Sequence, residues 1–160
     1  MFDKIKIAVF FLLLLIFSKI ESQENSYTCD KVNRFVEKMN LYHVQPPAID
    51  DKFSALVYTS FLKTVDPLGL VFLSEDQLVF LKYKYQIDNQ INGNNCDFFQ
   101  IVLSTFKKRI SQLDSASATI MSKKIDFNTN ENLNYEKDSL VFCNSTKEQY
   151  SRLEKWIKYY

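Results

Sequence analysis

The chain has 160 residues, of which 46% are hydrophobic and 24% charged, so its composition is that of a globular protein with a core and not of a disordered chain. The formal net charge of +1 and the pI of about 7.6 exclude the strongly basic character typical of nucleic-acid-binding proteins, and we expect no nucleic-acid partner. The chain has only two glycines, too few for a phosphate-binding loop or a dinucleotide-binding fingerprint.

The N-terminus has the order of a secretory signal peptide. Lys4 and Lys6 are basic, an unbroken apolar run of eleven residues follows at Ile7–Phe17, and residues 18–23 are mostly polar. A membrane-spanning helix needs about 20 apolar residues, so this run is too short to cross a bilayer comfortably. We therefore predict a signal peptide over residues 1–22 and export of the remainder, with a membrane tether only if the signal is not cleaved.

The cysteine content is odd, with Cys29, Cys96 and Cys143 widely spaced and no CxxC pair. Export would permit a disulfide, and at most one can form within the chain. The favoured interpretation is that all three are small buried apolar side chains.

The first predicted helix begins at Thr28 or Asp30 and ends before the prolines at positions 46 and 47. Its apolar residues are spaced i, i+3, i+4 and i+7, the pattern of one helix face: Val32, Phe35, Val36 and Met39.

A second helix is predicted from Asp50 or Asp51, either of which can cap it, to about Val65. Its apolar face is expected at Phe53, Leu56, Val57, Phe61 and Val65. Asp66-Pro67 should end this helix, because proline has no N–H and disfavours a helical conformation at the residue before it.

The third predicted helix follows a tight turn at residues 66–69 and an apolar connector at residues 70–73. Ser74 begins a capping box with Gln77 at its third position, and Leu73 and Leu78 can form the matching hydrophobic staple. We expect this helix to reach about Ile91 and to stop at the Asn92-Gly93 signal.

The fourth predicted helix starts at Asp97 and is the longest, because a helical stripe continues for some 25 residues: Phe99, Val102, Leu103, Phe106, Ile110, Leu113, Ser117, Ile120 and Met121. Residues 126–134 read as a loop, and residues 140–142 as a short strand or a buried anchor. A second capping box at residues 145–148 opens the last helix, whose stripe is Tyr150, Leu153, Ile157 and Tyr160. The predicted fold class is all-α, about five helices in an irregular bundle over residues 28–160.

The sequence offers no convincing catalytic, cofactor-binding or metal-binding residue. His43 is the single histidine and has no local partner pattern, so a surface or packing role is favoured over a catalytic one. The acidic pairs Asp50-Asp51 and Glu75-Asp76 stand at helix starts, where capping explains them better than acid–base chemistry. Asn144-Ser145-Thr146 matches the glycosylation pattern, but Ser145 reads better as a helix cap. We therefore expect no catalytic residue, no cofactor and no metal in this chain.

Several short motifs, in a specific order and spacing, resemble the N-terminal domain of the tail-specific proteases, also called C-terminal processing peptidases. The strongest lie between His43 and Asp76: Ile49-Asp50-Asp51 with Phe53-Ser54, Phe61-Leu62, Val65-Asp66-Pro67 and Phe72-Leu73-Ser74. Weaker ones follow at Ile125-Asp126-Phe127-Asn128 with Glu131, and at Leu153 with Trp156. The resemblance extends over about residues 32–160. Val44 and Phe61 stand where the family has tyrosines, and Leu140-Val141-Phe142 stands where it often has Pro-Trp.

The resemblance implies a bacterial, periplasmic protein related to serine endopeptidases that cut exported proteins near nonpolar C-termini. In that family a Ser nucleophile and a Lys base are the catalytic groups, and a PDZ-like domain recognises the substrate tail. No residue here matches those motifs. The implied role is a non-catalytic helical scaffold, present without its PDZ and Ser/Lys regions and therefore not itself an enzyme. Its expected partners are protein substrates or the missing protease and PDZ regions.

The alternative is an autonomous exported helical module that binds another protein. Because the last stripe still runs at the chain end, the scaffold interpretation predicts an apolar patch there, made of Tyr150, Leu153, Trp156, Ile157 and Tyr160.

Overall fold

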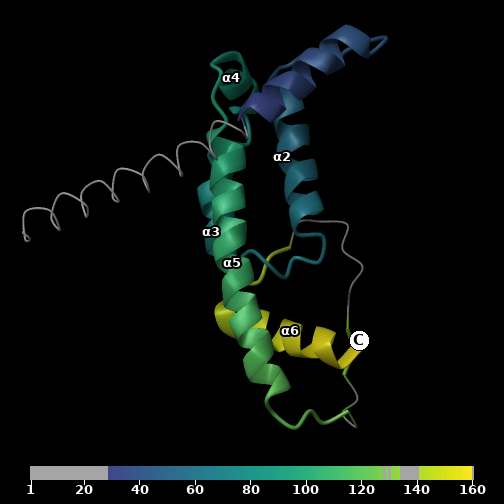
Figure 1. Ribbon diagram of the computed structural model, residues 1–160, viewed down its shortest axis with the longest axis vertical. Coiled ribbons are helices and arrows are strands. Elements are labelled where there is room, and N and C mark those ends of the chain that lie inside the picture. Colours follow the sequence, from purple (N-terminus) through teal and green to yellow (C-terminus); the bar gives the residue numbers. More distant parts are fainter. Residues whose placement is uncertain (1–28, 128, 130, 134–140, 160) are drawn as a thin grey trace, which may run out of the picture. The chain divides into compact units, whose positions relative to one another are not determined.

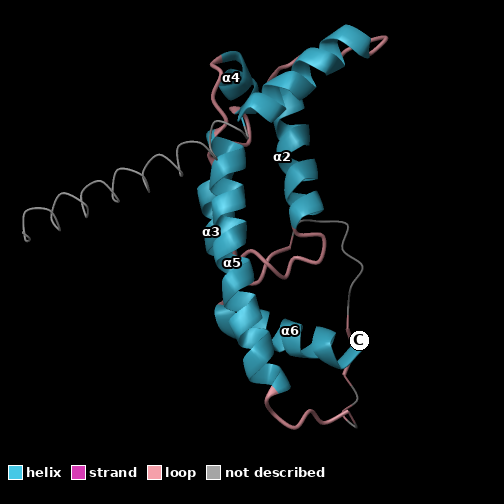
Figure 2. Ribbon diagram, in the orientation of Figure 1, coloured by secondary structure: helices cyan, strands magenta, loops and turns pink. Residues whose placement is uncertain are grey.

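The computed structural model describes residues 29–127, 129, 131–133 and 141–159, and the predicted signal peptide, residues 1–22, lies outside them. The described residues form helices joined by loops, with no strand drawn among them (Figures 1 and 2). The all-α prediction is therefore confirmed. Within the described ranges, no helix is both long and apolar enough to cross a membrane.

The chain divides into two compact units. The described residues of the first unit are 29–46 and 90–96, and those of the second are 47–89 and most of 97–159. The short helix α4 (Ile87–Asn92) crosses the division, so its beginning is described with the second unit and its end with the first.

The first unit contains the helix at residues 29–42, as predicted from its apolar spacing. Val36 is buried and Val32 and Met39 are partly buried, but Phe35 is 68% exposed, so its assignment to the inner face was wrong. The predicted cap residue Thr28 lies outside the described residues, whereas Asp30 lies inside the helix.

The C-terminal end of α4, which belongs to the first unit, has a hydrogen-bonded C-cap. The N–H of Asn95 donates to the carbonyl of Gln90 at 2.8 Å, and the N–H of Asn94 donates to the carbonyl of Ile91 at 3.1 Å. These two bonds make a Schellman motif, in which the residue after the cap takes the left-handed conformation. That residue is Asn94, with φ of 55°, and not Gly93, although the predicted stop was placed correctly.

In the second unit, α2 (Asp51–Val65) begins and ends as predicted, with Asp50 as its N-cap and Asp66 as its C-cap. Its buried side chains are spaced four residues apart: Ser54, Tyr58 and Leu62. Leu56, predicted to face the core, is 66% exposed. The other four predicted residues of this face are partly buried, but a serine and a tyrosine lie at its buried centre, which the apolar pattern does not reveal.

The predicted third helix is two helices, α3 (Ser74–Leu81) and α4, separated by turns at residues 82–86. In these turns N–H groups bond three residues back, as when Tyr83 donates to the Phe80 carbonyl at 2.9 Å. The break frees the N–H of Asp88 in the first turn of α4 for a bond from outside the helix. It bonds to the Ser54 hydroxyl oxygen at 2.8 Å, which the sequence pattern does not reveal.

The longest helix, α5 (Asp97–Met121), has the predicted bounds, and α6 (Thr146–Tyr159) packs on it (Figure 1). Their contact is a cluster of buried side chains from both helices, Leu113, Ile120 and Leu153, with Tyr150 and Ile157 packed against it. The predicted apolar patch at the chain end is therefore wrong for Tyr150, Leu153 and Ile157. Tyr160 lies outside the described residues, and Trp156 is partly buried. Ile110 and Met121, 40% and 69% exposed, were also misassigned.

Aromatic side chains form another part of the core in the second unit. The Tyr58 and Phe98 ring centres lie 5.5 Å apart, which joins α2 to α5. Phe72 packs edge-on against Phe80 and Phe142, at 5.2 and 5.9 Å between ring centres. Of the predicted strand or anchor at residues 140–142, the described part is an anchor, because Phe142 is buried. Edge-to-face ring pairs of this kind stabilise a core beyond the area that they bury.

Candidate functional site

The turn at residues 66–69 and the apolar segment at residues 70–73, together called the connector below, are held by the side chain of Asp66. The Asp66 side chain is buried and accepts three backbone N–H groups, from Leu70 at 2.9 Å, Val71 at 3.0 Å and Phe72 at 2.9 Å. Gly69 takes a positive φ of 61° inside this loop, a conformation that glycine adopts without steric cost. A buried polar loop without such an acceptor would leave its N–H groups unsatisfied.

Side chains of helix α6 bond to the backbone carbonyls of the connector. The Gln149 side-chain amide is buried and donates to the carbonyls of Leu70 at 2.9 Å and Val71 at 2.8 Å. Arg152 donates to the Gly69 carbonyl at 3.3 Å and also pairs with Glu148 one turn earlier. Both the N–H groups and the carbonyls of the connector are therefore held by side chains, which fixes the loop against α6.

Cys143 joins the end of the connector to the chain before α6. Its carbonyl accepts the N–H of Ser74 at 2.9 Å, and its thiol, fully buried, lies 3.5 Å from the Gly69 carbonyl. Leu73 and Cys143 form an isolated parallel bridge. The prediction that Cys143 is a small buried side chain is confirmed.

The predicted capping box at Ser74 is wrong by one residue. Leu73 is the N-cap of α3, and the carboxylate of Asp76 accepts its N–H at 2.9 Å. The Ser74 hydroxyl does not cap α3 but donates to the side-chain oxygen of Asn144 at 3.0 Å. The predicted staple is also absent, because Leu78 is 72% exposed.

Asp76 has a second role that the sequence did not reveal. Two nitrogens of Arg109 on α5 donate to its two carboxylate oxygens, at 2.8 and 2.9 Å, and a third contact reaches Glu75. The Arg109 side chain is 6% exposed, and the hydrogen bond that it donates to Asp76 raises the pKa of Arg109 above its ordinary value. Arg109 lies four residues before Leu113 on the same buried face. A charged residue on an apolar stripe was the signal that such a partner exists.

The remaining acidic candidate, Asp50-Asp51, acts in capping as predicted. Asp50 accepts the N–H groups of Lys52 and Phe53, each at 3.0 Å, and Asp51 is exposed in the first turn of α2. Ser54 and Asp88 form a buried reciprocal pair that joins α2 to the start of α4. The Ser54 hydroxyl donates to the Asp88 carboxylate at 2.7 Å while it accepts the Asp88 N–H.

Half of the second predicted capping box is present at the start of α6, because the returning bond of Glu148 reaches the backbone of Asn144 and not that of Ser145. Ser145 accepts the N–H of Glu148 at 3.2 Å, and Glu148 accepts the N–H of Asn144 at 2.8 Å. This backbone hydrogen bond lowers the pKa of Glu148 below its ordinary value. His43 is exposed, as the favoured interpretation held, and its ring accepts the N–H of Gln45 at 3.2 Å.

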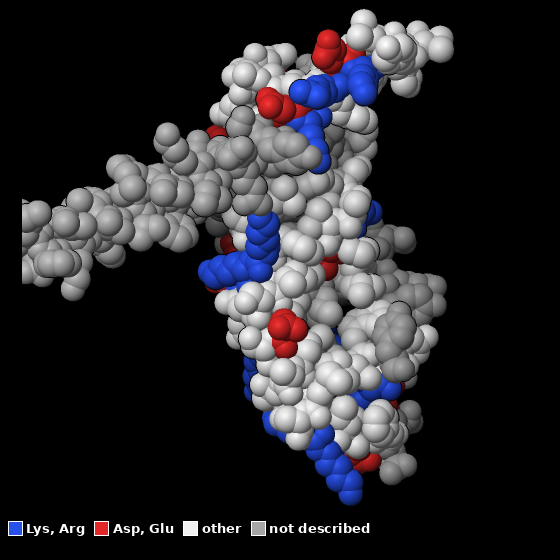
Figure 3. Space-filling view, viewed as in Figure 1, with Lys and Arg blue, Asp and Glu red and all other residues white. Residues whose placement is uncertain are grey.

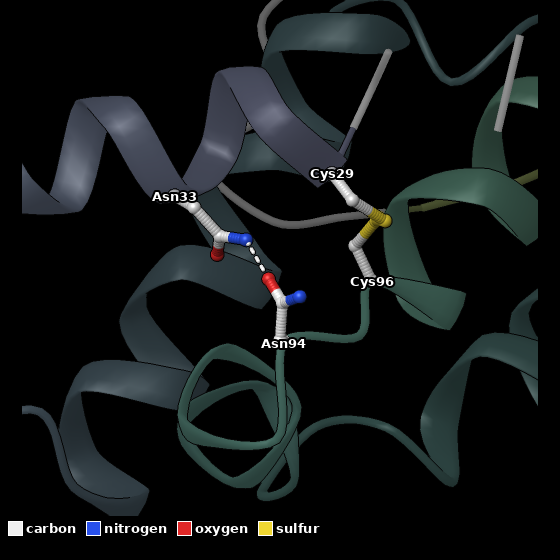
Figure 4. The surroundings of a disulfide bond; sticks show 4 residues. All are labelled: Cys29, Asn33, Asn94 and Cys96. Carbon is white, nitrogen blue, oxygen red and sulfur yellow. Dashed lines mark hydrogen bonds between the residues drawn. A yellow bond between two sulfur atoms is a disulfide. The ribbon is translucent and has the colours of Figure 1, made fainter. Parts of the chain in front are cut away.

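The first unit contains a disulfide between Cys29 and Cys96, whose Cα atoms lie 5.5 Å apart (Figure 4). Beside it, the side chain of Asn33 donates to that of Asn94 (Figure 4). The interpretation of all three cysteines as unbonded side chains is therefore wrong for Cys29 and Cys96. The sequence could not select this pair, because 67 positions separate the two residues and the fold brings them together.

The described residues offer little else that could hold a ligand. They contain no group of three or more His, Cys, Asp or Glu side chains able to bind a metal ion. A surface pocket lies beside the C-terminal end of α6, where Glu131 accepts a hydrogen bond from Lys158 at 2.7 Å. On the face shown in Figure 3, acidic and basic side chains are scattered among uncharged ones. The polar side chains described above bond to one another and to the backbone, so their role is to hold helices and loops in place.

A family model for the tail specific protease N-terminal domain matches residues 35–160. The chain belongs to this family. The match contains the Asp66 connector, the Arg109 ion pair and α6, so these features lie within the tail-specific protease domain. A comparison with curated proteins gave no match.

Proposed function

We propose that this domain is a non-catalytic helical scaffold for a tail-specific serine protease. The observation that carries the proposal is the family match over residues 35–160, which is to the N-terminal domain and not to the peptidase region. The roles of its ordered polar groups support it. Asp50 and Asp76 cap helices, Asp66 holds a loop, and Arg109 joins α3 to α5.

The domain acts outside the cytoplasm, in the bacterial periplasm. The signal-peptide order of residues 1–22 supports this part of the proposal, and so does the Cys29–Cys96 disulfide, because disulfides form and persist in oxidising compartments. A membrane tether depends on whether the signal is cleaved. Fractionation of cells that express the chain, with the mature N-terminus sequenced, tests the location. Recovery of the uncleaved chain in the cytoplasm would contradict it.

The scaffold serves a serine peptidase region that carries the Ser nucleophile, the Lys base and a PDZ-like domain. Reading the gene beyond codon 160 tests this directly. An in-frame or frameshifted PDZ and Ser/Lys region supports the proposal. Its absence from the locus would favour the second candidate, an autonomous exported module that binds another protein.

A further inference from the structure

The described part of the first unit, residues 29–46 and 90–96, buries few apolar side chains. Among the described residues 29–46 and 90–96, the buried apolar side chains are Val36, 8% exposed, and Cys96, 2% exposed. One of these two residues is half of the disulfide. Small units with too little apolar burial depend on covalent cross-links for their stability. In this unit the cross-link is the Cys29–Cys96 disulfide.

Two observations beside the disulfide indicate that the helix at residues 29–42 is held with little burial. The Asn33–Asn94 hydrogen bond is exposed to solvent, where water competes for both side chains (Figure 4). Phe35, Leu41 and Tyr42 on the helix at residues 29–42 are 68%, 68% and 80% exposed, so they add little burial. An isolated helix of this length is only marginally stable in water.

We propose that the Cys29–Cys96 disulfide is a redox-sensitive latch for the helix at residues 29–42. With the bond intact, the helix is held against residues 90–96. With the bond reduced, this helix detaches from those residues and loses its order, while the second unit stays folded.

The reduction is a thiol–disulfide exchange with a dithiol, such as a dithiol oxidoreductase or dithiothreitol. One thiolate of the dithiol attacks the Cys29 sulfur, the S–S bond breaks, and Cys96 leaves as a thiolate and takes up a proton. The second thiol of the reductant then attacks the mixed disulfide and releases Cys29. Two electrons and two protons pass to the protein, and the reductant becomes a disulfide. Attack at Cys29 is favoured because Cys29 is partly exposed and Cys96 is buried.

The second unit has its own means of staying folded. Its buried side chains include Leu113, Ile120 and Leu153 between α5 and α6, and the Phe72 cluster. It also contains the Arg109–Asp76 pair, and its Cys143 is not disulfide-bonded. Reduction therefore removes a covalent bond from the first unit alone.

Peptide-resolved hydrogen exchange on the purified exported chain, before and after dithiothreitol, tests the latch. We expect amides of residues 29–42 to exchange at least about ten-fold faster after reduction, and those of α5 and α6 to change by less than about two-fold. A Cys29→Ser variant should show the fast exchange without reductant. Cys143→Ser is the matched control and should respond to dithiothreitol as the unmodified chain does.

Three outcomes would overturn the latch. Thiol titration of the untreated, unfolded chain could find three free thiols in place of one. Residues 29–42 could keep their protection after full reduction. Both units could lose protection together, which would make the bond a staple for the whole chain. None of these outcomes bears on the scaffold role, which is decided by the protease region and by peptidase assays.

Discussion

At the scale of single residues, Asp66 shows what a local pattern can and cannot predict. The Asp66-Pro67 pair correctly marks the end of α2, because that signal depends on neighbouring residues. The three N–H groups that Asp66 accepts come from residues 70–72, after the chain has turned back. That geometry depends on the whole connector, so the sequence predicted the turn but not its buried acceptor.

Replacing Asp66 with alanine should therefore destabilise the protein strongly. The change leaves three N–H groups without their acceptor, two of them on the partly buried Leu70 and Val71 and one on the buried Phe72. We expect a loss of about 3 kcal/mol in the free energy of unfolding, measured by urea denaturation. Asp114→Ala, at an exposed position on α5, is the matched control and should change it by less than about 0.5 kcal/mol. Equal effects of the two variants would show that the Asp66 contacts contribute nothing.

Tyr58 presents the opposite case, a buried polar atom without a partner. Its side chain is 3% exposed, and its hydroxyl has no hydrogen-bond partner among the described residues. Burial raises the pKa of this hydroxyl above its ordinary value. The ring, by contrast, packs against Phe98.

Tyr58→Phe should leave the stability unchanged or raise it by up to about 1 kcal/mol, because it removes the unpaired hydroxyl and keeps the ring. Thermal unfolding monitored by circular dichroism measures the effect. Tyr42→Phe, at a tyrosine that is 80% exposed, serves as the control and should have no effect. A fall in stability of more than about 1 kcal/mol for Tyr58→Phe would mean that the hydroxyl is bonded in solution.

At the scale of elements, helix ends with strong local signals were predicted well and helix faces less well. Asp50, Asp66 and Ser145 cap the helices where the sequence placed them. The break between α3 and α4 was missed because it is stabilised by Ser54, which lies 34 positions from Asp88. Buried positions held by Arg109 and Gln149 were missed because each needs a specific partner from a distant element.

The contact between α3 and α5 is tested at Arg109. Arg109→Ala leaves the largely buried Asp76 carboxylate without its cation, and we expect a loss of about 3 kcal/mol in the free energy of unfolding. Arg109→Met, which retains the apolar part of the side chain, should cost less when combined with Asp76→Asn. Lys108→Ala on the exposed side of α5 is the control for urea denaturation. No difference between Arg109→Ala and Lys108→Ala would contradict the buried ion pair.

The packing of α6 is tested at Leu153, which is 9% exposed and belongs to the cluster shared with α5. Leu153→Ala should cost about 3 kcal/mol in the free energy of unfolding and make the chain more prone to aggregate. Tyr159→Ala, at a residue that is 65% exposed, should be close to neutral. If Leu153→Ala improved solubility without loss of stability, α6 would be an unpartnered surface helix and not part of the core.

At the scale of the whole molecule, the sequence predicted the fold class and the family, because both depend on patterns that recur along the chain. The helical periods indicated an all-α protein, and the ordered motifs between His43 and Asp76 indicated the tail-specific protease N-terminal domain. The division into two units and the Cys29–Cys96 bond were not predicted. Both depend on contacts between residues far apart in the sequence. The sequence alone allows several such contacts, such as three different pairings of the three cysteines.

We propose that this domain supports a protease and does not cut peptides itself. The most direct measurement is the cleavage of a fluorogenic peptide with an apolar C-terminus by the purified exported chain, with its helical fold confirmed by circular dichroism. A serine-directed inhibitor and a mock purification from cells without the gene are the controls. We expect the same rate for the chain and the mock preparation, with or without inhibitor. Inhibitor-sensitive cleavage that copurifies with the chain and exceeds the mock rate would contradict it.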